Sequence, residues 1–124
     1  MQKKLTQLLM GNRFEITVEA KTDAEADFFL KKAVEEISRI EALLSTYQST
    51  SETNLINENA GIKPVKVSDE TFSIIARSKK ISEITQGAFD ITYGSIDKRF
   101  WNFDTEMTSL PDEDLAQKSI ALID

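Results

Sequence analysis

Residues 6–20 alternate between apolar and polar positions, which is the period of a strand with one buried face. The apolar members are Leu8, Met10, Phe14, Ile16 and Val18. The pair Gly11-Asn12 interrupts the alternation. We therefore expect either two short strands joined by a turn or one strand that carries a bulge at Gly11.

A long amphipathic helix is predicted next. Thr22 and Glu25 have the spacing of a capping box, in which the Thr side chain accepts from the N–H of the Glu and the Glu side chain reaches back. Apolar residues then recur at steps of three and four, which predicts one wide buried stripe. They are Ala26, Phe29, Leu30, Ala33, Val34, Ile37, Ile40, Leu43 and Leu44. A helix from Asp23 to Tyr47 would be about 37 Å long.

Shorter elements are expected in the middle of the chain. Residues 49–51 end the long helix and cap a short one, which closes at residues 59–61. Residues 64–67 alternate as a brief edge strand, because the proline that begins it removes no ladder bond at an edge.

Ser68 or Asp69 then caps a second amphipathic helix, and Gly87 closes it as the first residue beyond the C-cap, C′. An acidic first turn after Pro111 predicts a last short helix. Residues 88–103 are predicted to form a strand and an ordered loop, and residues 119–124 a strand that is just beginning.

These elements predict an α+β fold in which a mixed or antiparallel sheet packs against one long amphipathic helix and one shorter helix. We expect residues 1–124 to form a single unit. A domain rarely ends on an unpaired apolar strand, so we expect the chain to be the N-terminal part of a larger α+β domain.

Composition excludes several kinds of chemistry. The chain has no His and no Cys, which removes a Ser-His-Asp triad, a thiolate nucleophile, a thiolate zinc site and disulfides. The 15 Lys and Arg against 21 Asp and Glu give a formal charge of −6, which repels phosphate backbones. Because Lys31-Lys32 and Lys79-Lys80 are isolated doublets in helical patterns, no nucleic-acid partner is expected.

The stretch from Gly87 to Thr92 has the residue types of a nucleotide site. Gly87 and Ala88 let a ligand approach the backbone closely, and Asp90 and Thr92 would share one face of an extended segment. The alternative is that Asp90 and Thr92 satisfy a turn while Phe89 and the other aromatic residues fill the core. Periodicity does not decide between them.

Two further residues could contact a planar ligand. Tyr47 could stack its ring on a flat molecule, or it could be a partly buried residue that closes the helical stripe. Met10 offers a pliable thioether beside Gly11, or it is a strand Met next to a turn Gly.

These residues occur in an order that resembles a known family. The motifs are Met10-Gly11, Leu43-Leu44-Ser45-Thr46-Tyr47, Ser51-Glu52 with Leu55-Ile56-Asn57, and Gly87-Ala88-Phe89-Asp90-Ile91-Thr92 followed by Gly94. This order resembles that of the FAD:protein FMN transferases, or ApbE-like flavin transferases, formerly called thiamine biosynthesis lipoproteins. The resemblance covers nearly the whole chain.

The resemblance implies a bacterial, Mg²⁺-dependent enzyme that transfers FMN from FAD to a Thr or Ser hydroxyl of an acceptor protein and releases AMP. It implies that Met10 and Tyr47 contact the flavin and that Ala88, Phe89 and Asp90 contribute to the FAD pocket. The matching Asn57 would support its loop.

The resemblance also places functions outside this segment. The family's glycine-rich stretch, catalytic His and metal ligands are expected beyond residue 124, so no catalytic or metal-binding residue is assigned here. In residues 100–103, Asn102 stands where the family often has Gly. The family implies the periplasmic side of the bacterial inner membrane, with anchoring only through a segment not present in this chain.

Two other functions compete with the transferase hypothesis: a stand-alone flavin or nucleotide-binding module, and a structural α+β interaction domain without catalysis.

Overall fold

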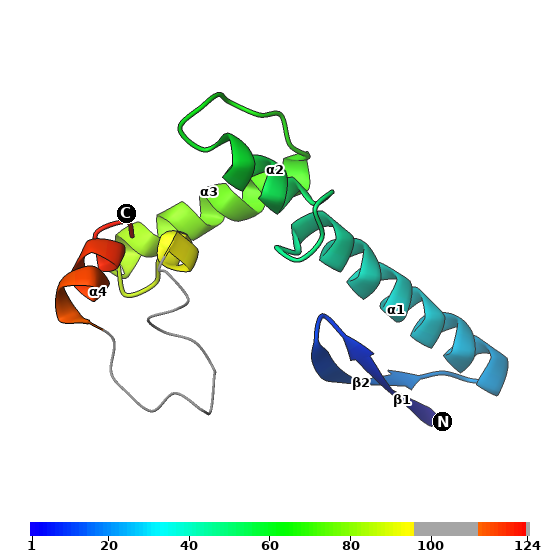
Figure 1. The fold of residues 1–124 in the computed structure, drawn as a ribbon. Helices are drawn as coiled ribbons and strands as arrows, with labels where there is room; N and C mark the ends of the chain where they lie inside the picture. Colours follow the sequence, from blue (N-terminus) through cyan, green and yellow to red (C-terminus); the bar gives the residue numbers. More distant parts are fainter. Residues whose placement is uncertain (96–111, 124) are drawn as a thin grey trace. The chain divides into compact units, whose positions relative to one another are not determined.

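The computed structural model describes residues 1–95 and 112–123 (Figure 1). Its elements are β1 (Gln2–Leu9), β2 (Asn12–Glu19), α1 (Asp23–Leu44), α2 (Glu52–Asn59), α3 (Asp69–Ile84), the 3₁₀ helix η1 (Ile91–Ser95) and α4 (Glu113–Ile120). The chain divides into two compact units, residues 1–71 and 72–124, so α3 begins in the first unit and continues in the second.

Strands β1 and β2 form an antiparallel hairpin in which Leu9 pairs with Asn12. Met10 and Gly11 make the turn between them, with φ angles of 52° and 70°. Positive φ at both central residues is the pattern of a type I′ turn, whose twist matches that of the flanking strands. The expectation of two strands joined by a turn is therefore confirmed, and no bulge forms at Gly11.

The inward face of the hairpin differs from the expected one. Leu5 pairs with Ile16 on one face, and Leu9, four residues along from Leu5, shares that face and is buried. Leu8 is 77% exposed. Because neighbouring side chains in a strand point to opposite faces, burial of Leu9 places Leu8 on the polar side. The expected inward position of Leu8 is wrong, and Met10 belongs to the turn rather than to a strand.

Helix α1 begins as predicted. The Thr22 side chain accepts from the N–H of Glu25, and the Glu25 carboxylate accepts from the N–H of Lys21. The helix ends at Leu44 rather than at Tyr47, because Ser45 has an extended backbone with ψ of 130°. Tyr47 therefore lies on the turn that follows α1.

The apolar stripe of α1 is only partly covered. The hairpin packs against α1 (Figure 1), and Ala26 and Leu30 are buried. The stripe continues through residues that are half-buried, and Phe29 is exposed. The half-buried members are Ala33, Val34, Ile37, Ile40, Leu43 and Leu44. The apolar stripe thus lies on α1 where it was predicted, but in the structure only two of its residues, Ala26 and Leu30, are buried.

The predicted edge strand at residues 64–67 is wrong, since residues 63–68 have neither strand nor helix. The N–H of Ser68 donates to the Glu52 carboxylate at 2.8 Å instead of to a neighbouring strand. The Ser68 hydroxyl then accepts from the N–H of Thr71 and caps α3, as the sequence predicted.

Helix α3 ends at Ile84, earlier than predicted. The N–H of Gly87 donates to the carbonyl of Ser82, and the N–H of Gln86 donates to that of Glu83. These are the two bonds of a Schellman motif, in which Gln86, with φ of 54°, is the C′ residue. Gly87 therefore occupies the next position, C″, rather than the predicted C′.

Helix α4 (Glu113–Ile120) extends into the segment that was predicted to begin a C-terminal strand. The short helix predicted from the acidic first turn is present, and Asp112 is its N-cap, accepting from the N–H of Leu115. Ser119 and Ile120 are its last residues and Ala121 is its C-cap, so residues 119–123 contain no strand. The predicted loop of residues 96–103, Pro111 and residue 124 lie outside the described residues.

No helix in residues 1–95 and 112–123 combines the length and apolar character needed to cross a membrane.

Replacing Ser51 by Ala should lower the free energy of unfolding by about 1 kcal/mol, because the N–H of Asn54 loses its acceptor at the start of α2. Ser51 is 1% exposed, so water cannot take over that role. Urea unfolding measures the change. Ser49→Ala, on the exposed part of the same turn, is the control. Equal stability of Ser51→Ala and wild type would contradict the role of this cap.

Candidate functional site

Tyr47 lies on the turn between α1 and α2 and is 91% exposed. Its N–H donates to the Ser45 hydroxyl at 3.1 Å. The interpretation of Tyr47 as a partly buried residue that closes the α1 stripe is therefore wrong for this chain. Its ring is presented at the surface, where a flat molecule could stack on it.

Met10 occupies the first central position of the hairpin turn and is partly exposed. A positive φ is uncommon for a residue other than Gly and carries a local conformational cost. The two-residue turn imposes that conformation, because both of its central residues must have positive φ. Met10 and Tyr47 thus lie on two different turns of the first unit.

Ala88, Phe89 and Asp90 follow the Schellman turn at the end of α3. The Asp90 carboxylate accepts from the N–H of Thr92 at 2.8 Å and from its hydroxyl at 2.6 Å. Both bonds lower the pKa of Asp90, and the bond from the Thr92 hydroxyl has the larger effect. They favour the anionic form of the carboxylate. The structure brings these three predicted residues together at one turn.

The same geometry corrects one expectation. Residues 91–95 form η1, so Asp90 and Thr92 do not lie on one face of an extended segment. Their mutual hydrogen bonds satisfy a turn, as the alternative interpretation held. Phe89 is partly exposed rather than part of a core.

A polar cluster that sequence reasoning did not assign lies around Glu52, the first residue of α2. Its carboxylate accepts from the N–H and the hydroxyl of Ser68, each at 2.8 Å, and from the Thr71 hydroxyl. The Thr71 bond is the largest cause of a lowered Glu52 pKa. Thr71 is buried and Ser68 half-buried, so the cluster joins α2 to the start of α3. The sequence contained one signal for this cluster: Ser68 was a predicted helix cap, and Thr71 follows it by three residues.

Arg39 makes a second connection within the first unit. Its guanidinium donates to both oxygens of Glu36, at 2.7 and 2.8 Å, and to both oxygens of Glu70, at 2.9 and 3.0 Å. These bonds raise the Arg39 pKa and lower those of Glu36 and Glu70. The network connects α1 to the first turn of α3. Because all three side chains are exposed, it adds little to the free energy of unfolding.

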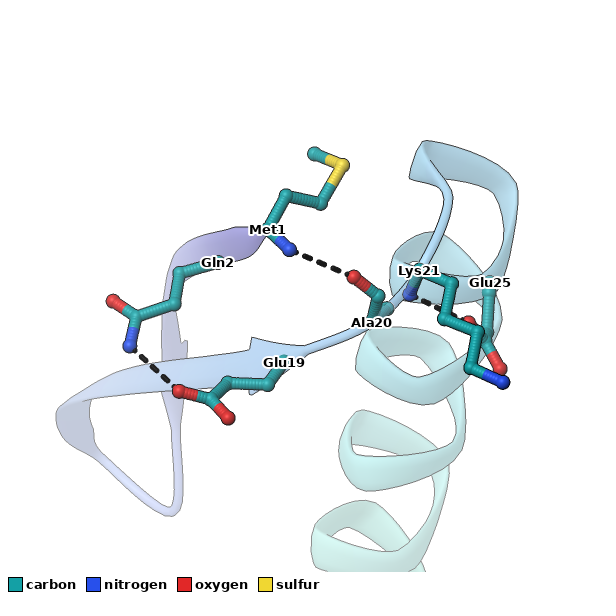
Figure 2. A pocket seen from close by; sticks show the side chains of 6 residues that line it. All are labelled: Met1, Gln2, Glu19, Ala20, Lys21 and Glu25. Atoms are coloured by element: carbon teal, nitrogen blue, oxygen red, sulfur yellow. Dashed lines mark hydrogen bonds between the residues drawn. The ribbon is translucent and has the colours of Figure 1, made fainter.

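A shallow pocket lies where the hairpin meets α1 (Figure 2) and is lined by Met1, Gln2, Glu19, Ala20, Lys21 and Glu25. The terminal amine of Met1 donates to the carbonyl of Ala20 at 2.9 Å, and Gln2 donates to Glu19 at 2.9 Å. These bonds close the open end of the hairpin. None of the residues predicted to contact the flavin lines this pocket.

Within the part of the chain that the structure describes, no group of three or more Asp, Glu, His or Cys side chains could hold a metal ion. The expectation that Mg²⁺ ligands lie beyond residue 124 stays a prediction.

Comparison with known proteins decides the family. The model of the ApbE family matches residues 10–124. The chain belongs to the ApbE family. The resemblance drawn from the ordered motifs is confirmed.

Individual ApbE relatives agree with this assignment. The FAD:protein FMN transferase of Haemophilus influenzae is 31% identical over 87 residues, which are 69% of this chain and 23% of that protein. The FAD:protein FMN transferase of Klebsiella pneumoniae is 30% identical over 105 residues, 83% of this chain and 30% of that protein. The chain thus spans less than a third of the length of these relatives.

The ApbE fold is also shared. The crystal structure of the ApbE protein of Thermotoga maritima matches with a TM-score of 0.82 at 24% identity, over 97% of this chain and 38% of that one. The α+β class expected from the sequence is confirmed.

Replacing Glu52 by Gln should remove stability that is present near neutral pH and lost in acid. The folded-state pKa of Glu52 lies below its unfolded value. Its contribution is therefore complete above the unfolded pKa and disappears as pH falls through the folded one. Urea midpoints for wild type and variant should differ at about pH 7 and converge as pH falls through the folded-state pKa of Glu52.

Glu58→Gln, on the exposed side of the same helix, is the control for a lost charge and should leave the midpoint near its wild-type value. A wild-type and Glu52→Gln difference that stayed constant with pH would contradict the proposed cause.

Proposed function

We propose that this chain supplies part of the FAD-binding cleft of an enzyme that transfers FMN from FAD to a Thr or Ser hydroxyl of an acceptor protein. The observation that carries the proposal is the ApbE family match over residues 10–124, which includes every residue predicted to contact the flavin. The names of the Haemophilus and Klebsiella relatives support it.

In the proposed reaction, the hydroxyl oxygen of the acceptor attacks the phosphorus of the FMN half of FAD. A new phosphoester bond forms, the phosphoanhydride bond to AMP breaks, and the hydroxyl proton is released. Catalysis of this kind depends mainly on positioning and on stabilisation of charge. The contribution proposed for this chain is to bind and orient the flavin half.

Each predicted residue has a role that suits its surroundings. The exposed ring of Tyr47 would stack on the flavin, and the Met10 thioether would line its edge. Ala88 has a small side chain beside the turn that ends α3, so a ligand can approach the backbone there. Phe89 would pack on the ligand, and the anionic Asp90 would accept from its N–H or hydroxyl groups.

Mg²⁺ and the acidic character of the chain are linked in this proposal. A formal charge of −6 disfavours a bare pyrophosphate, so a cation and backbone N–H groups would have to meet the phosphates. Since the described residues include no cluster suited to a metal, no step is assigned to Mg²⁺ in this segment.

For the 124 residues alone, we propose weak flavin binding with little or no transfer. The chain spans 23% and 30% of the two transferase relatives, and a cleft with one wall missing does not exclude water. The periplasmic location and a membrane anchor outside this segment remain part of the proposal for the whole protein.

The whole protein that contains this sequence should transfer FMN. Incubation with FAD, Mg²⁺ and an acceptor that carries a Thr should add the mass of one FMN to the acceptor, as measured by mass spectrometry. An acceptor with the Thr replaced by Val lacks the attacking oxygen and should stay unmodified. Retained FAD binding with no adduct would instead favour a binding module.

Tyr47→Ala should weaken flavin binding by about 1–3 kcal/mol if the ring stacks on the ligand. Tyr47→Phe keeps the ring and should bind like wild type. The measurement is an FAD titration followed by flavin fluorescence. Phe28→Ala removes another exposed aromatic ring, from α1, and serves as the control. An unchanged affinity in Tyr47→Ala would remove Tyr47 from the site.

A further inference from the structure

The turn that carries Tyr47 is hydrogen-bonded to a side chain of α2, that of Asn54. The amide nitrogen of Asn54 donates to the carbonyl of Thr46 at 3.0 Å and to that of Gln48 at 2.8 Å. These are the two carbonyls on either side of Tyr47. A side-chain amide has two N–H donors, so one group can satisfy both acceptors.

Asn54 is itself fixed. Its backbone N–H donates to the hydroxyl of Ser51, the buried N-cap of α2. The N–H of Ser51 donates to the carbonyl of Gln48, and the N–H of Tyr47 donates to the Ser45 hydroxyl. The backbone around Tyr47 is therefore bonded on both sides, although the side chain is 91% exposed.

We propose that Asn54 is a positioning residue for Tyr47: it clamps the turn so that the ring is presented to the flavin in one orientation before the ligand arrives. This proposal rests on the function proposed above, in which Tyr47 stacks on the flavin. Ordering a surface side chain or loop on binding reduces affinity, and a turn that is already ordered avoids that loss. Asn54 acts through Tyr47 and need not touch the ligand.

The chemistry of the clamp requires donors. Asp has the shape of Asn but a carboxylate that donates nothing and repels the two carbonyls. Asn54 is the third residue after the N-cap of α2, where a negative charge is favourable for a helix. Asn54→Asp should thus open the clamp without weakening α2, which separates loss of positioning from loss of the helix.

The first measurement needs no ligand. In NMR relaxation of the whole protein that contains this sequence, without FAD, the Tyr47 amide should have an order parameter of about 0.85 in wild type and below about 0.6 in Asn54→Asp. Asn59→Asp is the matched control, because the Asn59 amide bonds the Leu55 carbonyl of the same helix and does not reach the turn. It should leave Tyr47 ordered. A mobile Tyr47 in wild type, or equal loosening in both variants, would overturn the clamp.

The second measurement is an FAD titration of the whole protein that contains this sequence, in four forms: wild type, Asn54→Asp, Tyr47→Ala and the double variant. Asn54→Asp should weaken FAD binding about two- to tenfold when Tyr47 is present. In the Tyr47→Ala background it should have no effect, since the residue it positions is gone. The same loss in both backgrounds would overturn the positioning role.

The two measurements distinguish the ways of failing. A clamp that loosens Tyr47 in Asn54→Asp, together with FAD affinity unchanged in both Asn54→Asp and Tyr47→Ala, would contradict the proposed flavin contact and with it the positioning role. Weaker binding in Tyr47→Ala but not in Asn54→Asp would keep the flavin contact and reject the positioning role.

Discussion

The Glu52 carboxylate organises the polypeptide between α2 and α3. The loop of residues 60–68 has no strand or helix of its own, and three donors from its end and from α3 converge on this one side chain. Because Glu52 begins α2 directly after the Ser51 cap, the end of the loop is held at the N-terminus of that helix. Arg39 adds a connection from α1 to Glu70 in the first turn of α3. These polar contacts connect α1, α2 and the start of α3 in the first unit, whereas the buried apolar side chains of the described residues, Leu9, Ala26 and Leu30, come from β1 and α1.

Local signals in the sequence predicted most of the elements. The caps at Thr22, Ser51 and Asp112 depend on residues three apart, so they can be recognised without knowing the fold. The predicted strand at 64–67 was wrong, and the residue directly after it, Ser68, donates its N–H to a carboxylate sixteen residues away, a contact that periodicity does not contain. The apolar run at 119–123 was wrong for another reason: a run this short has no period that separates helix from strand.

The candidate site shows the same division. The order of the motifs predicted the family, which the family match confirms, while Met10, Tyr47 and residues 88–90 stay predictions as flavin contacts. Their surroundings were not predictable, since the end of α1 before Tyr47 depends on the extended backbone of Ser45. The amide of Asn54 has the same character: nothing in the sequence says that it reaches back across the turn to two carbonyls. Family motifs thus indicate candidate residues, and hydrogen bonds between residues apart in the sequence decide how those residues are exposed.

The turn at Met10 and Gly11 also restricts the length of the connection between β1 and β2. It contains two residues, and the pairing of Leu9 with Asn12 sets the register of the whole hairpin. One inserted residue absorbed into β2 would move Phe14, Ile16 and Val18 to the outer surface and bring charged side chains such as Glu15 inward. Chains that share this hairpin can therefore change residues at the turn more readily than they can change its length. The position of Met10 in the hairpin thus depends on the number of residues in the turn as well as on side-chain packing.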